Sequence, residues 1–434
     1  MKQLTRLFIP ICLETLFYML SGMVDTLMLS AVGDYAVGAV GTANSYIGIF
    51  IIMFSIISSG MVSVMTQNIG AGRPGVAYQA RQLGLLFNAV AGVLMAVFLF
   101  SGAGAILRMV GIADALYEPA LIYLKIVGGG CILNAVIPIL SSYLRAFGYT
   151  KQPLYATIVG NIANFVMNAV FLFVLHKGVA GVATATVISK ILNLCIVLYF
   201  SHKLISAKNS TERIANKTVL GQIVKVGLPS ACETALYNVA MMLVIRFLNQ
   251  MDAEGLNVTA RSYTATISNF SYCVGAALAQ ANAIMTGWHI GAGELEECDR
   301  GTKRAAFVGV CVAVCMETAI VLGSGFIMPL FTDNPEMTAL VRKLLAIDIV
   351  LEIGRVTNLV FGQALKTSGD AVFPAVIAAV FMFVFAVGGT WLFGISMGLM
   401  AVGAYIGLAS DECVRAVGMV WRWKTGKWRT KKLV

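Results

Sequence analysis

The chain has 434 residues, of which 59% are hydrophobic and 12% charged, and its mean hydropathy is +0.84. A soluble protein of this length could not bury so much apolar surface, so the composition predicts a multi-pass membrane protein. The formal net charge of +10 does not indicate a nucleic-acid binder, because the basic residues are scattered between apolar segments and are dense only from Arg422 to Lys432.

Long apolar runs predict twelve transmembrane helices. Runs such as Ile47 to Met65 and Val372 to Phe393 carry no charged residue and match the roughly 20 residues that cross about 30 Å of hydrocarbon. Because lipid cannot satisfy backbone N–H and C=O groups, these runs must be helical. In chain order the predicted helices are Leu7 to Leu29, Ala43 to Met65, Leu83 to Ala103, Pro119 to Leu140, Pro153 to Leu175, Val179 to Phe200, Val226 to Leu248, Ser262 to Met285, Ala305 to Met328, Leu344 to Leu365, Phe373 to Phe393 and Met397 to Val420.

The longest polar connection, Lys203 to Lys225, follows the sixth predicted helix. It predicts an N-terminal six-helix lobe over residues 1–205, a cytoplasmic linker over 206–225 and a C-terminal six-helix lobe over 226–434. Few basic residues fall at the ends that would face outward, namely Arg108, Lys177, Arg246, Arg261, Arg342 and Lys343. By the positive-inside rule, both termini are expected in the cytoplasm.

Three sequence patterns occur twice in the same order, 219 to 221 residues apart, which indicates a duplicated unit. They are Pro-x-x-x-Glu-Thr-x-x-Tyr at Pro10 to Tyr18 and Pro229 to Tyr237, Ile-Gly-Ala-Gly at Ile69 to Gly72 and Ile290 to Gly293, and a Leu-basic-x-x-Gly then Pro pattern at Leu144 to Pro153 and Leu365 to Pro374. Six spans return the chain to its starting side, so two parallel lobes around a central cleft are expected. This arrangement suits alternating access, and the absence of a selectivity-filter motif makes a channel a weaker fit.

Ionisable residues inside the predicted spans cost about 2.5 kcal/mol or more each, and so indicate a partner, a water-filled cavity or a function. Asp25 lies in an otherwise apolar segment of the first span, with no basic residue close by on the same helix. A carboxylate that faces a cavity there would bind a proton or a cation. The alternative is an acid near a helix end that reaches the outer interface.

Three amides of the fifth span share one helical face, because Asn161, Asn164 and Asn168 are three and four residues apart. Their oxygens are hard ligands suited to Na⁺ and can also hydrogen-bond a carboxyl group. The alternative is that these amides only join neighbouring helices.

Two acid-rich groups with one Arg each occur in the tenth and twelfth spans: Asp348, Glu352 and Arg355, and Asp411, Glu412 and Arg415. We expect them to form a structural ion-pair network, with the binding of protons or a cationic substrate by a surplus acid as the alternative. Glu14 and Glu233 occupy equivalent positions of the repeat, four residues after a proline, which predicts a shared packing or gating role.

Motifs for nucleotide binding or hydrolysis are absent: the sequence has no GxxxxGK[ST], HExxH or GxSxG. The nine cysteines lie mostly in apolar runs, without CxxC or Cys/His ligand spacing. The sequence therefore predicts no enzyme and no resident cofactor.

Taken in order, these segments resemble the multidrug and toxic compound extrusion (MATE) family of cation-coupled efflux transporters. The resemblance covers nearly the full length and is carried by Pro10 to Asp34, Gln67 to Gly72, Leu144 to Gly148, Gly160 to Phe173, Gly178 to Thr186 and Glu352 to Asp370. It implies a two-lobed fold that opens alternately to the two sides. It also implies export of amphiphilic, often cationic compounds in exchange for H⁺ or Na⁺.

The resemblance further implies a coupling site in the first lobe, on Asp25, with Asn164, Asn168 and Thr186 as its partners. Many members have Asp where this chain has Asn168, so Asp25 is the only acid of the implied site and the choice between H⁺ and Na⁺ stays open. The candidates in the second lobe are Glu233, Asp348, Glu352 and Arg355.

The sequence thus predicts an all-α polytopic protein of the cytoplasmic membrane that acts as a monomeric secondary antiporter. Its expected partners are the lipid bilayer and a small-molecule substrate, with H⁺ or Na⁺ as the coupling ion. One alternative is a lipid-linked precursor flippase, which would need a strongly cationic cleft. Another is a non-transporting membrane scaffold, which would not need a coupling acid.

Overall fold

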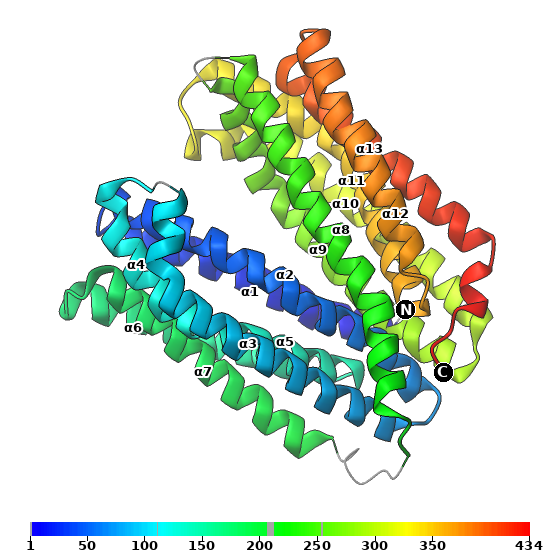
Figure 1. Cartoon of the computed structure of the whole chain (residues 1–434). Coiled ribbons are helices and arrows are strands. Elements are labelled where there is room, and N and C mark those ends of the chain that lie inside the picture. The colour runs from blue at the N-terminus through cyan, green and yellow to red at the C-terminus, as the bar shows by residue number, and fades with distance from the viewer. Residues whose placement is uncertain (1, 111, 206–211, 253–254) are drawn as a thin grey trace. The chain divides into compact units, whose positions relative to one another are not determined.

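The computed structural model describes residues 2–110, 112–205, 212–252 and 255–434, and all regular structure in these ranges is helical (Figure 1). Eight helices in them are long and apolar enough to cross a membrane, and the bent pair α4 and α5 makes a ninth span. Three more long helices, α9, α11 and α13, carry many of the buried polar side chains described below. Together they match the twelve predicted spans.

The chain divides into two compact units, residues 9–227 and residues 1–8 with 228–434. We refer to them as the N-terminal and C-terminal lobes. Residues 206–211 of the predicted linker lie outside the described residues. Residues 216–225 of that linker are helical, because α8 already begins at Asn216.

The N-terminal lobe is built from α1 to α7, drawn from blue to green in Figure 1. The elements are α1 (Lys2–Ser30), α2 (Asp34–Gly70), α3 (Pro74–Val110), α4 (Asp114–Gly129), α5 (Cys131–Ala146), α6 (Lys151–Ala169) with the π-helical turn η1 (Val170–Val174), and α7 (Gly178–Leu204). Several of these helices are longer than the predicted apolar runs, because polar end turns continue the helix where hydropathy no longer marks it.

The fourth predicted span, Pro119 to Leu140, is not one straight helix. It breaks at Gly130, and α4 and α5 meet there at an angle of 43°. The break falls in the run Gly128-Gly129-Gly130, where the lack of side chains lowers the cost of leaving helical geometry. The break falls between Tyr123 on α4 and Asn134 on α5, two residues of the site described below.

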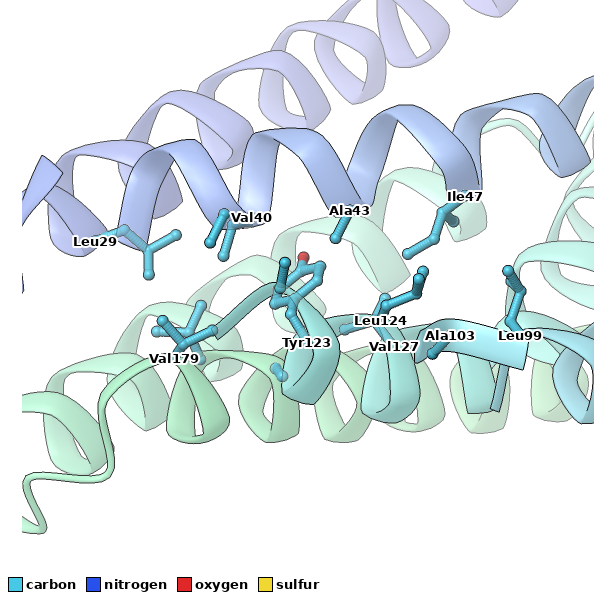
Figure 2. Packing of buried hydrophobic residues seen from close by; sticks show 14 of the residues in the cluster. Leu29, Val40, Ala43, Ile47, Leu99, Ala103, Tyr123, Leu124, Val127 and Val179 are labelled. Atoms are coloured by element: carbon cyan, nitrogen blue, oxygen red, sulfur yellow. The ribbon is translucent and has the colours of Figure 1, made fainter. Parts of the chain in front are cut away.

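The core of the N-terminal lobe packs α2 against α3, α4 and α7 (Figure 2). Ala43 on α2 and Leu124 on α4 are fully buried, and the ring of Tyr123 points toward α2 beside Val40. Small residues such as Ala43 let helices approach closely, which is the usual basis of helix packing inside membranes. The tyrosine hydroxyl is thus held at a fixed place within an apolar cluster.

The C-terminal lobe contains α8 to α13, drawn from green to red in Figure 1. The elements are α8 (Asn216–Met251, of which residues 228 onward belong to this lobe), α9 (Leu256–Ala292), α10 (Leu295–Ile327) with the 3₁₀ turn η3 (Met328–Leu330), α11 (Pro335–Ser368), α12 (Val372–Phe381) continued by the π-helical turns η4 (Met382–Val387) and η5 (Thr390–Ser396), α13 (Met400–Lys424) and the 3₁₀ turn η6 (Lys427–Thr430).

The backbones of the eleventh and twelfth spans come into close contact. Gly403 and Gly407, four residues apart on α13, face η5 and the residues before it. A Cβ atom on Gly403 would lie 2.4 Å from the carbonyl carbon of Phe393, and one on Gly407 would lie 2.9 Å from the carbonyl carbon of Gly389. These glycines therefore set how closely α13 can approach its neighbour.

The C-terminal residues fold back onto their own lobe. Trp428 stacks on Trp423 with ring centroids 4.2 Å apart, and the indole nitrogen of Trp423 donates to Asp299 Oδ1 at 2.7 Å. Arg422 binds both carboxylate oxygens of Asp370 with its Nε and Nη2 atoms. Part of the basic C-terminal cluster thus pairs with acids of the same lobe.

Candidate ion-coupling and binding sites

Asp25 is held by an amide on another helix of the N-terminal lobe. The side-chain nitrogen of Asn168 on α6 donates to Asp25 Oδ1 at 2.7 Å and to Asn164 Oδ1 at 3.1 Å. Asn168 is fully buried and Asn164 is 5% exposed, whereas Asp25 is half-buried. The structure thus brings together three of the four residues that the resemblance implied for the coupling site.

The shared face of α6 explains this contact. Asn164 and Asn168 are one turn apart and point to the same side, and Asn161, one turn earlier, donates to the backbone oxygen of Phe17 on α1 at 2.8 Å. Asn161 therefore joins two helices, as the packing alternative predicted. Asn164 and Asn168 lie next to the carboxylate instead.

Thr186 reaches this group through Tyr123, a residue that the sequence reasoning did not select. The hydroxyl of Tyr123 faces Thr186 on α7 and Asn44 on α2. The carboxylate of Asp25 is also close enough to interact with this hydroxyl electrostatically. Thr186 itself donates to the backbone oxygen of Val182 at 2.9 Å, which leaves its oxygen lone pairs available. The position of Tyr123 in a long apolar run gave no sign that its hydroxyl would face polar groups.

Lys190 is a second residue that the sequence reasoning did not select for the site. Its ammonium donates to Asn134 Oδ1 on α5 at 2.7 Å. The carboxylate of Asp25 is close enough to interact with this ammonium electrostatically. Within the described ranges neither Asp25 nor Lys190 makes an ion pair within 4.0 Å. Each is bound to a neutral amide, so the carboxylate stays available to a small cation.

The oxygen atoms around Asp25 fit a proton or a hard cation. Asn168 Oδ1 is buried and accepts no hydrogen bond from any described residue. Rotation of this amide by half a turn would present the oxygen to a cation bound at Asp25, next to the oxygens of Asn164 and Tyr123. Such an all-oxygen set suits hard ions and not thiophilic metals.

The acids of α13 form an ion-pair network, as expected. Arg415 pairs with Asp411 at 2.7 Å and with Glu412 at 2.8 Å, and Asn358 on α11 donates to Glu412 Oε2 at 3.0 Å. All four side chains are buried. One arginine thus binds two carboxylates, and the amide of Asn358 joins this group to α11.

The acids of α11 are less well matched. Arg355 pairs with Glu352 Oε1 and approaches Glu412 at 3.7 Å, but Glu352 Oε2 and Asp348 Oδ2 accept no hydrogen bond from the described residues. Asp348 and Arg355 line a cavity of 470 Å³, together with Glu233, Tyr237, Tyr272 and Asp411. Three of the four second-lobe candidates, Glu233, Asp348 and Arg355, thus line one cavity, and Glu233 also has an ion-pair partner of its own.

That partner explains two of the duplicated patterns. Glu14 on α1 pairs with Arg145 on α5 at 2.6 Å, and Glu233 on α8 pairs with Lys366 on α11 at 2.7 Å. In each lobe the Glu of the Pro-x-x-x-Glu-Thr pattern thus binds the basic residue of the Leu-basic-x-x-Gly pattern. The shared packing role predicted for Glu14 and Glu233 has its structural counterpart in this ion pair.

We expect Glu14→Gln and Arg145→Gln each to lower the melting temperature of the purified protein in detergent. The pair is mostly buried, with 17% and 13% of the two side chains exposed, and leaving one partner alone costs about 1–3 kcal/mol. The control is Glu118→Gln, which changes an exposed acid of the same lobe. The charge-reversed pair Glu14→Arg with Arg145→Glu should recover part of the loss; a reversed pair that melts no higher than the single variants would contradict this role.

A comparison with protein-family models finds the family described as MatE, which matches residues 10–170 and 229–392. The two matched segments begin 219 residues apart, the same interval as the first duplicated pattern. The match covers most of both lobes.

Curated relatives and solved structures agree with this match. The chain is 32% identical to "Uncharacterized transporter YisQ" of Bacillus subtilis over 97% of this chain and 94% of that protein. It is 20% identical to "Probable multidrug resistance protein NorM" of Thermotoga maritima over 100% of this chain and 94% of that protein. A MATE crystal structure in the bent conformation superposes with a TM-score of 0.86 at 20% identity, covering 99% of this chain and 96% of the other.

Proposed function

Because the chain belongs to the MatE family of efflux transporters, we propose that it is a secondary antiporter that exports amphiphilic organic cations in exchange for H⁺ or Na⁺. The observation that carries this proposal is the Asp25 carboxylate, which is held by Asn168 at 2.7 Å and has no ion-pair partner within 4.0 Å in the described ranges. An intramembrane acid without a countercharge is costly, and a transported ion would offset that cost.

In the proposed cycle Asp25 alternates between an ion-bound and an ion-free state. Ion binding neutralises the carboxylate, and the Asn168 amide adjusts by presenting either its N–H or its oxygen to the site. Each state of the N-terminal lobe favours one of two conformations of the protein, so the ion gradient biases the conformational equilibrium. Asn164, Tyr123 and Thr186 complete the set of oxygen atoms around the ion.

The chemistry of the C-terminal cavity supports an organic cation as the substrate. Its 470 Å³ are lined by the rings of Tyr237, Tyr272 and Tyr405 and by four acids and four basic residues, and one oxygen of the acid Asp348 has no hydrogen-bond partner among the described residues. Carboxylates attract a cation, and aromatic faces bind one that is partly desolvated. A second, shallow groove on α1 and α2 is lined by Met19, Met23 and Leu27, flexible side chains that adapt to differently shaped apolar groups.

We place the protein in the cytoplasmic membrane with both termini in the cytoplasm, on the distribution of its basic residues. We further propose that it acts as a monomer, because each lobe has its own compact core. No cofactor and no catalytic step are part of the proposal. The runner-up function, a flippase for lipid-linked precursors, is disfavoured because it would need a strongly cationic cleft, whereas the basic residues that line this cavity are matched in number by acids. A scaffold without transport would have no use for an unpaired acid at Asp25.

The test is efflux of ethidium from proteoliposomes that contain the full chain, under a pH gradient and a Na⁺ gradient imposed separately. Export driven by one gradient, and absent when that gradient is collapsed, is the expected result and names the coupling ion. Ethidium movement that is the same with and without both gradients would overturn the antiporter proposal. Movement of a fluorescent lipid headgroup in the same vesicles would favour the flippase.

A further inference from the structure

We propose that the residues after the last transmembrane helix form a docking surface for anionic lipid headgroups, and that headgroups bound there stabilise the adjoining end of the C-terminal lobe. The surface consists of four lysines on a folded segment that covers residues 421–433: Lys424, Lys427, Lys431 and Lys432. We call it the lysine surface. The proposal concerns the bilayer and not a transported substrate, so it does not depend on the antiport function proposed above.

The basic residues of this segment divide into two groups. Its arginines bind acids of the lobe: Arg422 binds Asp370, and Arg429 binds Glu296 at 2.7 Å. The four lysines are all exposed, and none of them has an ion-pair partner within 4.0 Å in the ranges that the structure describes. Four like charges that the lobe leaves without a partner form a surface that attracts anions.

The outer face of α13 places the first of these lysines at the level of the headgroups. Val417, Trp421 and Lys424 are four and three residues apart, so they share one helical face. The side chains of Val417 and Trp421 are 69% and 57% exposed, which in a membrane span indicates contact with lipid. Tryptophan at the end of a span marks the boundary between hydrocarbon and headgroups. Lysines clustered directly after that boundary are attracted to anionic lipids.

Buried side chains hold the segment in place, so the lysines project from a fixed backbone. The chain turns after α13 at Gly426, whose φ of 69° favours glycine. Trp428 is 1% exposed, stacks on Trp423 and donates through its indole nitrogen to the Trp423 backbone oxygen at 3.0 Å. Leu433 is buried as well. A headgroup bound to the lysines therefore acts on a folded segment.

The same segment contacts two other helices of the lobe near their ends. The indole nitrogen of Trp423 donates to Asp299 Oδ1, close to the start of α10, at 2.7 Å. A Cβ atom on Gly369, directly after α11, would lie 2.4 Å from the backbone oxygen of Lys431. Because a ligand stabilises the arrangement to which it binds, headgroups on the lysines would also stabilise these ends of α10 and α11.

The test is hydrogen exchange of the full chain in nanodiscs of phosphatidylcholine alone and in nanodiscs of equal parts phosphatidylcholine and phosphatidylglycerol. In the native protein, the amides of residues 298–304 and 366–370 are expected to exchange about tenfold more slowly in the anionic nanodiscs. Combining Lys424→Gln, Lys427→Gln, Lys431→Gln and Lys432→Gln should remove this difference. High salt should reduce it, because exposed charges are screened.

The matched control removes four exposed lysines from the N-terminal lobe, by combining Lys151→Gln, Lys203→Gln, Lys217→Gln and Lys225→Gln. It lowers the net charge equally and should keep the native difference. Melting curves in neutral detergent show that each variant is folded, and Lys431→Gln with Lys432→Gln serves if the fourfold variant is not. Equal exchange of the native protein in both nanodiscs, a difference that survives in the folded lysine-surface variant, or a difference lost in the control as well would overturn the proposal.

Discussion

Replacing Asp25 with Asn is expected to abolish gradient-driven export while leaving the protein folded. The neutral amide has the same shape and can still accept the 2.7 Å hydrogen bond from Asn168, so the contact between α1 and α6 survives. It cannot take up a proton or neutralise Na⁺. An ion moving down a gradient of 100 mV supplies about 2.3 kcal/mol, enough for a substrate concentration ratio on the order of 50-fold, and in the variant this ratio should fall to about 1.

The measurement is the steady-state ratio of ethidium across proteoliposome membranes under the gradient that drives the native protein. Asp114→Asn is the matched control, because it neutralises an exposed acid in the same lobe, at the first residue of α4. It should retain the native ratio. A normal ratio in Asp25→Asn would show that the coupling ion binds elsewhere, while a loss in both variants would point to a general effect of charge.

Replacing Gly403 with Val is expected to prevent the C-terminal lobe from folding. Even a Cβ atom would lie 2.4 Å from the carbonyl carbon of Phe393 and 2.5 Å from its oxygen, so α13 would have to move away from η5. The contact is between two backbones, and no side-chain rotation can relieve it. For Gly403→Ala, overpacking of this kind costs about 1–3 kcal/mol, and the two further methyl groups of Val enlarge the clash.

The readout is the monodisperse fraction in size-exclusion chromatography, followed by the melting temperature of whatever protein is recovered. Gly325→Ala is the control, since a Cβ atom at Gly325 on α10 would meet nothing within 4 Å. That change should be neutral or stabilise the helix by up to about 1 kcal/mol. Native-like chromatography and melting of Gly403→Val would refute the close contact between α13 and η5.

The sequence was a good guide to the helices and to which polar side chains of the first lobe lie close together, for physical reasons. Lipid requires long apolar runs, so span positions are visible in composition alone. Asp25 was identifiable because a carboxylate in such a run is costly, and the helical period placed Asn164 and Asn168 on one face. The broken fourth span was predicted as continuous, because hydropathy does not register three consecutive glycines as a bend.

Contacts between distant helices were beyond such reasoning. Glu317 is a single acid in an apolar run, and its neighbours Asp348 and Glu352 lie on another helix with which it shares no local pattern. Likewise, both members of the Glu14–Arg145 pair were seen as parts of repeated motifs, but nothing in their spacing showed that the motifs bind each other. These relations depend on how helices pack, which one sequence does not reveal.

The matched ion pairs bear on the ancestry of the fold. The pair of Glu14 with Arg145 recurs as Glu233 with Lys366, so an ancestral six-helix chain would already have held it before its gene was copied. The same interval of 219 residues carries Asp25 onto Val244, a buried apolar residue. The two copies thus kept a common scaffold while their ion chemistry diverged, and an exchange of equivalent segments between them would preserve folding but not transport.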